Sequence, residues 1–148
     1  MIDIDLVRRK LARLNMYLDK LEPFTKKSFN EYLSDPYTKY STERLIQLIV
    51  ECASDINSHV VVEKEKRPPE DYTSSFLRAA EVGLITPSLA QKIKGSGGMR
   101  NVITHEYMDI DDEKVYNILP SAIVDFKEYI KQVDRFLDGL EDQGSNTK

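Results

Sequence analysis

The sequence is poor in several residue types that carry structure or chemistry. Its 148 residues include one cysteine, Cys52, two histidines and no tryptophan. A single cysteine excludes an intramolecular disulfide, and its apolar neighbours indicate a core thiol in a reducing compartment. No stretch approaches about 18 uninterrupted apolar residues, and the N-terminal segment lacks the apolar core of a signal peptide. We therefore expect a cytoplasmic protein with no membrane partner.

An excess of basic residues is also missing. The chain has 21 Lys and Arg against 25 Asp and Glu, a net charge of −4. Nucleic-acid binders usually carry basic excess, so the total charge argues mildly against one and leaves only a local basic patch for binding a phosphate backbone. Hydrophobic residues make up 41% of the chain, which indicates one globular domain with a single core.

No strand-like alternation occurs, and the periodicity predicts an all-α fold. An apolar stripe runs from Val7 to Leu21, and Thr42 is a candidate cap for a helix from roughly Glu43 to Glu63. A third helix is expected over about 71–82 and ends at Gly83. A fourth begins at Pro87 after the Thr86 cap and continues toward the motif. The last begins after the Asp111 cap and runs through Pro120 to Leu140. We expect one domain over residues 1–141 and a polar, disordered tail over 142–148.

The stretch from Arg100 to Tyr107 holds the residue types that are the best candidates for catalysis. Histidine, here His105, is the natural proton carrier near neutral pH. Arginine, here Arg100, is the natural clamp for a phosphate that gains charge. The pair suggests chemistry at a phosphodiester. The simpler interpretation is a helix end with a surface histidine and tyrosine.

The spacing within this stretch raises a geometric problem. Arg100 and His105 lie five residues apart, so on an ideal helix their side chains point about 140° apart. Either the helix ends near Thr104 and the chain turns, or the site combines residues of two chains related by a two-fold axis. Asn101 and His105 are four residues apart and can face together, so Asn101 is a candidate orienting group. Tyr107 is a candidate to stack on a base or bind a phosphate.

A second polar set precedes the motif. Glu51, Asp55 and His59 recur every four residues and lie along one side of a helix. They form either a structural Asp–His pair or the polar wall of a cleft or subunit interface. The carboxylates Asp109, Asp111, Asp112 and Glu113 lack the spacing and glycine of a calcium loop, and we expect no metal and no cofactor.

The arrangement Arg100, four residues, His105, one residue, Tyr107 resembles the signature of the HepT family of HEPN toxins, with Asn101 as the polar residue after the arginine. The similarity extends in order and spacing over RLIQLIVECASDINSHVVVE, DYTSSFLRAAEVGLITPSLAQKI and MRNVITHEYMDIDDEKVYNIL, from about Glu43 to Leu119. One departure is Ser96-Gly97-Gly98 before the motif, where bulkier residues are usual.

This resemblance implies a homodimeric, antiparallel HEPN bundle of about five helices with the motif in a cleft between subunits. It implies a metal-independent endoribonuclease toxin of a type VII-like toxin–antitoxin system, acting on RNA. Its partner would be a nucleotidyltransferase antitoxin of the MntA kind, which neutralises the toxin by AMPylation of Tyr107. The alternative is a non-catalytic HEPN module that binds such a nucleotidyltransferase and a nucleotide.

Overall fold

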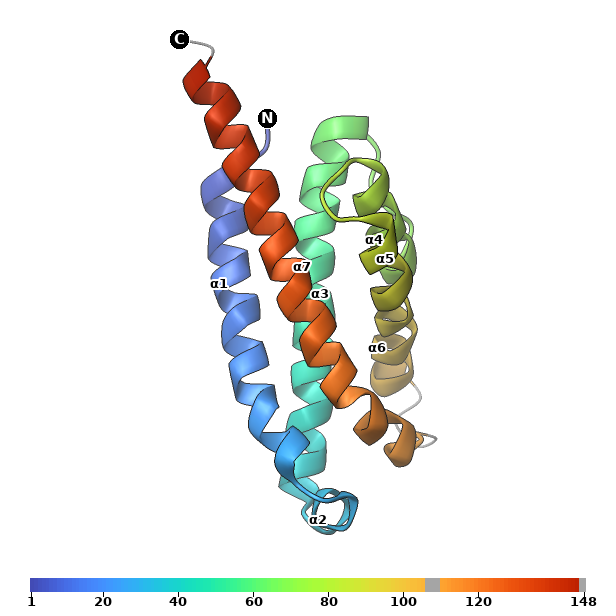
Figure 1. The fold of residues 1–148 in the computed structure, drawn as a ribbon. Coiled ribbons are helices and arrows are strands. Elements are labelled where there is room, and N and C mark those ends of the chain that lie inside the picture. Colours follow the sequence, from blue (N-terminus) through green and yellow to red (C-terminus); the bar gives the residue numbers. More distant parts are fainter. Residues whose placement is uncertain (106–109, 147–148) are drawn as a thin grey trace.

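The computed structural model describes residues 1–105 and 110–146, and these contain helices and no strand. The elements are α1 (Ile4–Leu21), the 3₁₀ helix η1 (Glu22–Lys26), α2 (Phe29–Ser34), α3 (Pro36–Glu65), α4 (Tyr72–Glu81), α5 (Pro87–Ile93), α6 (Gly95–His105) and α7 (Asp112–Asn146). Long helices α1, α3 and α7 run side by side, and α4, α5 and α6 form a second layer beside them (Figure 1). The all-α prediction is confirmed.

Helix α1 follows the predicted apolar stripe. Asp3 begins it, because its carboxylate accepts a hydrogen bond from the Leu6 backbone N–H at 3.0 Å. Every stripe position is buried: Val7, Leu11, Leu14, Leu18 and Leu21. Pro23 falls in η1, where the chain tightens after α1 before a capping box at Ser28 starts α2.

Helix α3 begins earlier than the sequence analysis places it. The cap is Asp35, whose carboxylate accepts from the Tyr37 backbone N–H at 3.0 Å, and Pro36 occupies the first turn. Thr42 is buried inside this 30-residue helix, so the prediction that it caps a helix starting at Glu43 is wrong. Asp-Pro supplies both the capping carboxylate and a fixed backbone angle, which makes it the stronger start signal.

By length and composition alone, α3 is apolar enough to cross a membrane. However, 56% of its most apolar window is buried inside the bundle, and the central helix of a packed core passes the same test. The apolar character of α3 is therefore explained by contacts with α1 on one side and with the second layer on the other.

The second layer confirms two predicted boundaries and corrects a third. Helix α4 stops at Gly83, whose φ of +85° suits glycine, and Thr86 caps α5 through the Leu89 N–H at 3.2 Å. The single helix expected from Pro87 into the motif is instead two helices, α5 and α6. The Ser96 hydroxyl donates to the Ile93 carbonyl at 2.6 Å, and such side-chain bonds compete with the helical backbone pattern at a glycine-rich point.

Glycine is required at one position of α6. A Cβ on Gly97 would lie 2.8 Å from both the Tyr72 Cβ and the Thr73 backbone nitrogen, so α6 can approach α4 closely only without a side chain there. Gly98 has open space around it. Within the unusual Ser96-Gly97-Gly98 segment, Gly97 therefore allows the motif helix to pack closely against α4.

Helix α7 starts as predicted, because the Asp111 carboxylate accepts from the Lys114 N–H at 3.2 Å. Its inner face buries Phe126, Tyr129 and Val133, and Pro120 lies within it. The helix continues to Asn146, so the segment from residue 142, predicted to be disordered, is helical up to that point. Most residues of this segment, Asp-Gln-Gly-Ser-Asn, are weak helix formers, so it continues a helix that packing of the preceding turns has already nucleated.

Candidate active site

Helix α6 carries the motif side chains that the structure describes: Arg100, Asn101 and His105. Tyr107 lies outside the described residues. The helix remains regular through His105, so no turn separates the arginine from the histidine. The turn that the sequence analysis allows near Thr104 therefore does not fall between the two side chains.

The Arg100 guanidinium is fixed from three directions. Its Nε and Nη2 both donate to Glu51 Oε1 of α3, at 3.1 and 2.6 Å. Its central carbon lies 4.7 Å from the centre of the Tyr72 ring of α4, a cation–π distance. Nη1 donates to Asn101 Oδ1 at 3.4 Å. The side chain is only 15% exposed, so this cation is held in a defined orientation at the junction of three helices.

His105 and Asn101 lie on the outer side of α6 and are exposed. Arg100, by contrast, is turned inward toward α3 and α4. On one chain the imidazole and the guanidinium therefore occupy different sides of the motif helix, as the 140° estimate requires. A phosphate that contacts both groups has to approach along the edge where Asn101 lies between them.

The polar set on α3 divides in two. Glu51 contacts the motif through Arg100, whereas Asp55 pairs with Lys10 Nζ of α1 at 3.6 Å. His59 Nε2 accepts from the Asp3 backbone N–H at 2.9 Å. Asp55 and His59 thus bond to the N-terminal helix region and not to each other. Of these three residues, Glu51 joins the candidate site.

Two side chains that the sequence analysis missed support the motif. Gln47 Nε2 donates to Thr104 Oγ1 at 3.1 Å, which ties α3 to the residue before His105. Tyr72 underlies Arg100. Gln47 stands four residues before Glu51, a helical spacing that could have pointed to it. Tyr72 comes from another helix and had no signal in the sequence.

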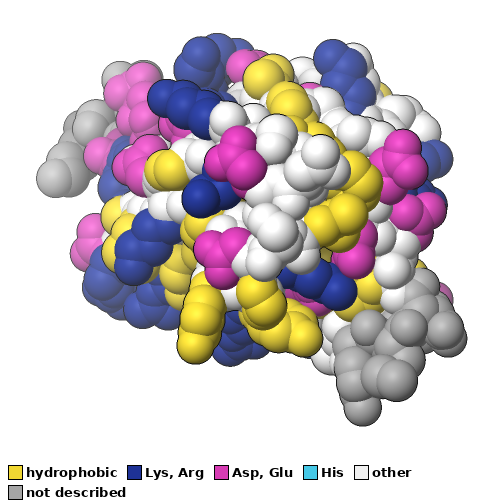
Figure 2. Space-filling view, turned by 90° about the horizontal axis from the view of Figure 1, so that it is seen from below, with side chains coloured by type: hydrophobic (Ala, Val, Ile, Leu, Met, Phe, Trp, Pro, Cys, Tyr) yellow, Lys and Arg dark blue, Asp and Glu magenta, His cyan; other side chains and the backbone are white. Residues whose placement is uncertain are grey.

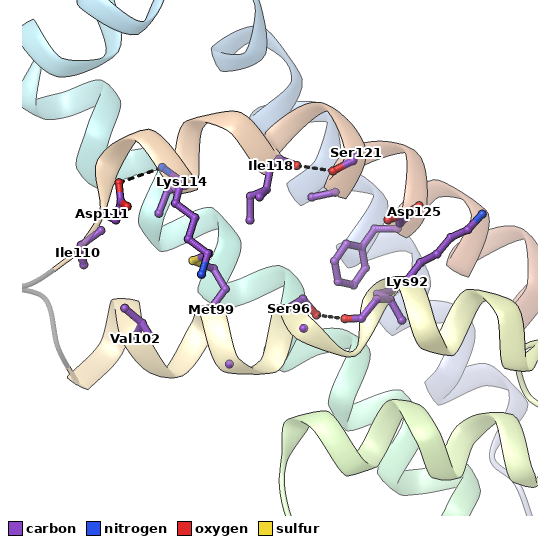
Figure 3. Close-up of a pocket in the computed structure, with 16 residues that line it drawn as sticks. Lys92, Ser96, Met99, Val102, Ile110, Asp111, Lys114, Ile118, Ser121 and Asp125 are labelled. Atoms are coloured by element: carbon purple, nitrogen blue, oxygen red, sulfur yellow. Dashed lines mark hydrogen bonds between the residues drawn. The ribbon is translucent and has the colours of Figure 1, made fainter.

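A groove lies on the other flank of α6. It has a volume of about 620 Å³ between α6 and α7, and Met99, Val102 and Ile118 extend into it (Figure 3). Lys92 and Lys114 stand at its edges with Asp111 and Asp125. None of Arg100, Asn101 and His105 lines it. The groove is therefore an apolar neighbour of the motif helix and not the place where the motif side chains meet.

Candidate metal ligands do not gather in the described part of the chain. Over residues 1–105 and 110–146, no three His, Cys, Asp or Glu side chains lie close enough together to hold a metal ion. Cys52 is buried, and burial raises the pKa of its thiol. Its Sγ–H donates to the Lys10 carbonyl at 3.3 Å, which confirms the core role expected from its neighbours.

The bundle and the motif together define a class. Residues 14–133 match the family described as Ribonuclease HepT-like, and the chain belongs to that family. The family resemblance seen in the sequence is thereby confirmed, as is the assignment to ribonucleases.

Individual relatives agree with this family. The tRNA nuclease HepT of Aphanizomenon flos-aquae is 34% identical over 140 residues, which cover 93% of this chain and 94% of the relative. The mRNA nuclease HepT of Shewanella oneidensis is 27% identical over 85 residues, covering 57% and 64% of the two chains.

Solved structures show the same fold. The tri-AMPylated HEPN toxin of Shewanella oneidensis, in complex with MNT antitoxin, superposes with a TM-score of 0.78 at 22% identity, covering 91% of this chain and 99% of that chain. YutE of Bacillus subtilis, described as a cytosolic protein of unknown function, gives 0.78 at 14% identity over 93% and 92%. The predicted HEPN bundle is therefore confirmed.

Proposed function

We propose that this chain is the metal-independent endoribonuclease toxin of a type VII-like toxin–antitoxin pair, located in the cytoplasm. One observation carries the proposal. Arg100 is held partly buried by Glu51 and Tyr72, while Asn101 and His105 stand exposed beside it on the same helix. An oriented cation next to an accessible proton carrier supplies the charge stabilisation and the proton transfer that phosphodiester cleavage needs.

The reaction follows from the two groups. His105 takes the proton of a ribose 2′-hydroxyl or returns one to the leaving 5′-oxygen. The 2′-oxygen attacks the adjacent phosphorus, the bond from phosphorus to the 5′-oxygen breaks, and the 5′-oxygen gains a proton. The products are a 2′,3′-cyclic phosphate and a free 5′-hydroxyl. Arg100 stabilises the charge that builds on the phosphate oxygens, and Asn101 orients His105 or the substrate.

The cleavage chemistry has a direct test. Purified protein should cleave RNA in EDTA and leave a 2′,3′-cyclic phosphate, which mass spectrometry of the products identifies. His105→Ala should reduce the rate by about 10²–10⁴-fold, the usual contribution of a general acid or base. Full activity of His105→Ala protein, prepared free of host nucleases, would exclude this mechanism.

A homodimer completes the site in this proposal. The support is the divergence of Arg100 and His105 on one regular helix, since two copies related by a two-fold axis bring both groups to one cleft from opposite sides. The apolar groove beside α6 supplies further surface on the same helix. Light scattering should show a dimer at micromolar concentration. A monomer with undiminished activity would contradict the composite site.

The partner in this proposal is a nucleotidyltransferase antitoxin of the MntA kind, which adds AMP to Tyr107. The support is the family resemblance at Tyr107 and the AMPylated state of the Shewanella oneidensis neighbour. An added phosphate near Arg100 would pair with the guanidinium and remove it from catalysis.

A conservative variant tests this control. Tyr107→Phe keeps the ring and removes the acceptor oxygen, so the variant should fold and dimerise but escape neutralisation. Each form is incubated with the partner and ATP, and intact mass and RNA cleavage are then measured. Equal modification of wild type and variant would place the acceptor elsewhere.

The second candidate is a non-catalytic module that binds the nucleotidyltransferase and a nucleotide. The net charge of −4 favours it, because RNA-binding surfaces are usually basic. The two candidates differ in one observable: RNA cleavage by the purified dimer that disappears in His105→Ala protein occurs only if the chain is an enzyme.

A further inference from the structure

A second groove lies at the end of the bundle where α1 runs into η1 and α3 begins. It has a volume of about 500 Å³, and we call it the basic–aromatic groove; its lining residues are Lys20, Phe24, Tyr40, Ser41, Arg44 and Leu45. Seen from this end, the molecule exposes hydrophobic side chains directly beside Lys and Arg side chains (Figure 2). The groove is separate from the large apolar groove between α6 and α7.

The charge of the basic–aromatic groove is opposite to that of the whole chain. Lys20 and Arg44 line it, and no carboxylate does. In the described residues neither cation forms an ion pair, whereas the neighbouring Lys39 is paired with Asp112 at 3.3 Å. In a protein with net charge −4, two uncompensated cations in one concave place attract an anion.

The aromatic component is equally exposed. The Tyr40 side chain is 64% exposed, so its ring is accessible to a ligand. The Lys39 ammonium lies 5.8 Å from the centre of the Tyr40 ring, which adds positive potential next to the ring. An open aromatic face with nearby cations matches the stacking sites that bind single-stranded nucleic acid, where a base covers the ring and a phosphate meets the cations.

A chain of hydrogen bonds joins this groove to the motif. Arg44 Nη1 donates to Gln47 Oε1 at 3.1 Å, and Gln47 Nε2 donates to Thr104 Oγ1 at 3.1 Å, one residue before His105. Arg44, Gln47 and Glu51 share one face of α3, and seven residues of helix span about 10 Å. The groove and the motif therefore lie along one continuous track on the protein surface.

We propose that the basic–aromatic groove is an RNA subsite: Tyr40 stacks on a nucleobase, and Lys20 with Arg44 binds a phosphate of the strand whose cleavage occurs at the motif. This inference rests on the proposed ribonuclease function and adds the part of the molecule that holds a flanking nucleotide. It also accounts for how an acidic chain binds RNA, because the two cations are gathered where the strand runs even though acidic residues outnumber basic ones over the whole chain.

Binding separated from cleavage tests the subsite. In a His105→Ala background, the affinity for a fluorescent single-stranded oligoribonucleotide is measured by anisotropy. Adding Tyr40→Ala should weaken binding roughly 5- to 100-fold, the range of base–aromatic stacking, and Tyr40→Phe should retain it. Tyr37→Ala is the matched control, because Tyr37 is 84% exposed on the same helix and lies outside the groove.

The cations have their own measurement. Arg44→Gln or Lys20→Gln should each lower the slope of log affinity against log salt by about 0.7, the value for one phosphate contact of a single strand. Arg9→Gln, an exposed arginine of α1 outside the groove, should leave the slope unchanged.

The remaining outcomes separate this proposal from the function on which it rests. Equal affinities of the Tyr40→Ala and Tyr37→Ala proteins would overturn the subsite while cleavage by wild type still upholds the nuclease. Tyr40→Ala that weakens only the complex with the nucleotidyltransferase would also overturn it and make the groove a protein contact. Absence of both RNA binding and RNA cleavage in wild-type protein would remove the proposed function itself.

Discussion

Among the arginines that are paired with carboxylates, Arg8 and Arg100 differ in almost every other respect. Arg8 of α1 contacts three acidic residues of α7: Asp134 at 2.6 Å, Asp138 at 3.0 Å and Glu141. Arg100 of α6 contacts one, Glu51 of α3. Arg8 is 35% exposed and its partners are exposed by half or more, whereas Arg100 is 15% exposed and also lies against Tyr72.

The number of ion pairs does not identify the functional residue. All three nitrogens of Arg8 donate to acids that follow one another along α7, in four hydrogen bonds, which raises the pKa of Arg8 and joins α1 to α7. Arg100 sends two donors to a single oxygen, so N–H groups on both terminal nitrogens remain for a phosphate. The proposed role of Arg100 therefore rests on its firm orientation together with donors that remain available.

Replacing each arginine in turn should reveal the largest difference in activity between the two. Arg100→Ala should lower RNA cleavage by about 10²–10³-fold, because it deletes the donors that stabilise the developing charge. Arg8→Ala should leave cleavage close to wild type. The measurement is kcat/KM on one RNA substrate at equal protein folding, verified by circular dichroism. Comparable losses in both variants would mean that Arg100 acts through stability alone.

The packing of α6 against α4, which positions Arg100, can be changed without altering a motif residue. Gly97→Ala forces a Cβ against α4 at Tyr72 and Thr73, so it should destabilise the protein by about 1–3 kcal/mol, as overpacking does. Gly98→Ala is the control, because its surroundings are open and alanine favours a helix by up to about 1 kcal/mol. Thermal denaturation should move in opposite directions for the two variants. A rise for both would show that α6 stands further from α4.

The single carboxylate beside Arg100 allows a finer test. Glu51→Gln keeps the size of the side chain and weakens its hold on the guanidinium, so kcat should fall by about tenfold while stability changes little; small misplacements of catalytic groups cost this much or more. Steady-state kinetics and a melting curve check both parts. An unchanged kcat would mean that Tyr72 and Asn101 orient Arg100 without Glu51.

The smallest effect belongs to the exposed cluster. Arg8→Ala should cost no more than about 1 kcal/mol of unfolding free energy, because solvent screens pairs of this exposure. High salt should reduce the difference from wild type further. Urea denaturation at low and high salt provides the measurement, and a loss of several kcal/mol that salt leaves unchanged would show that α1 and α7 depend on this cluster.

Much of the architecture was predictable because it depends on interactions between residues close together in the sequence. The stripe from Val7 to Leu21, the Thr86 and Asp111 caps and the stop at Gly83 all depend on neighbours within a few residues, and the structure has each of them. The errors at Thr42 and after Ile93 arose where two local signals competed. Asp35-Pro36 was the stronger start, and Ser96 with its glycines interrupted a helix that periodicity alone would have continued.

The candidate site was predictable only in part. The spacing predicted that Arg100 and His105 would point in different directions on a regular helix, and both lie on α6. It did not tell which side chains Arg100 would meet. Glu51 entered the sequence analysis as one of three similar stripe positions, and only packing showed that it faces α6 while Asp55 and His59 face α1.

The sequence by itself determined that this chain forms a helical bundle and where several of its helices begin or end, and it marked the stretch from Arg100 to Tyr107 as the candidate site. Those properties follow from periodicity, capping and motif spacing, which act over a few residues. The tertiary structure alone decided that Glu51 holds Arg100 across 49 residues of chain, that Gly97 lets α6 close on α4, and that Tyr40 and Arg44 border one groove. Periodicity states which face of a helix turns inward, but the rotation and approach of two helices decide which polar side chains at their edge meet.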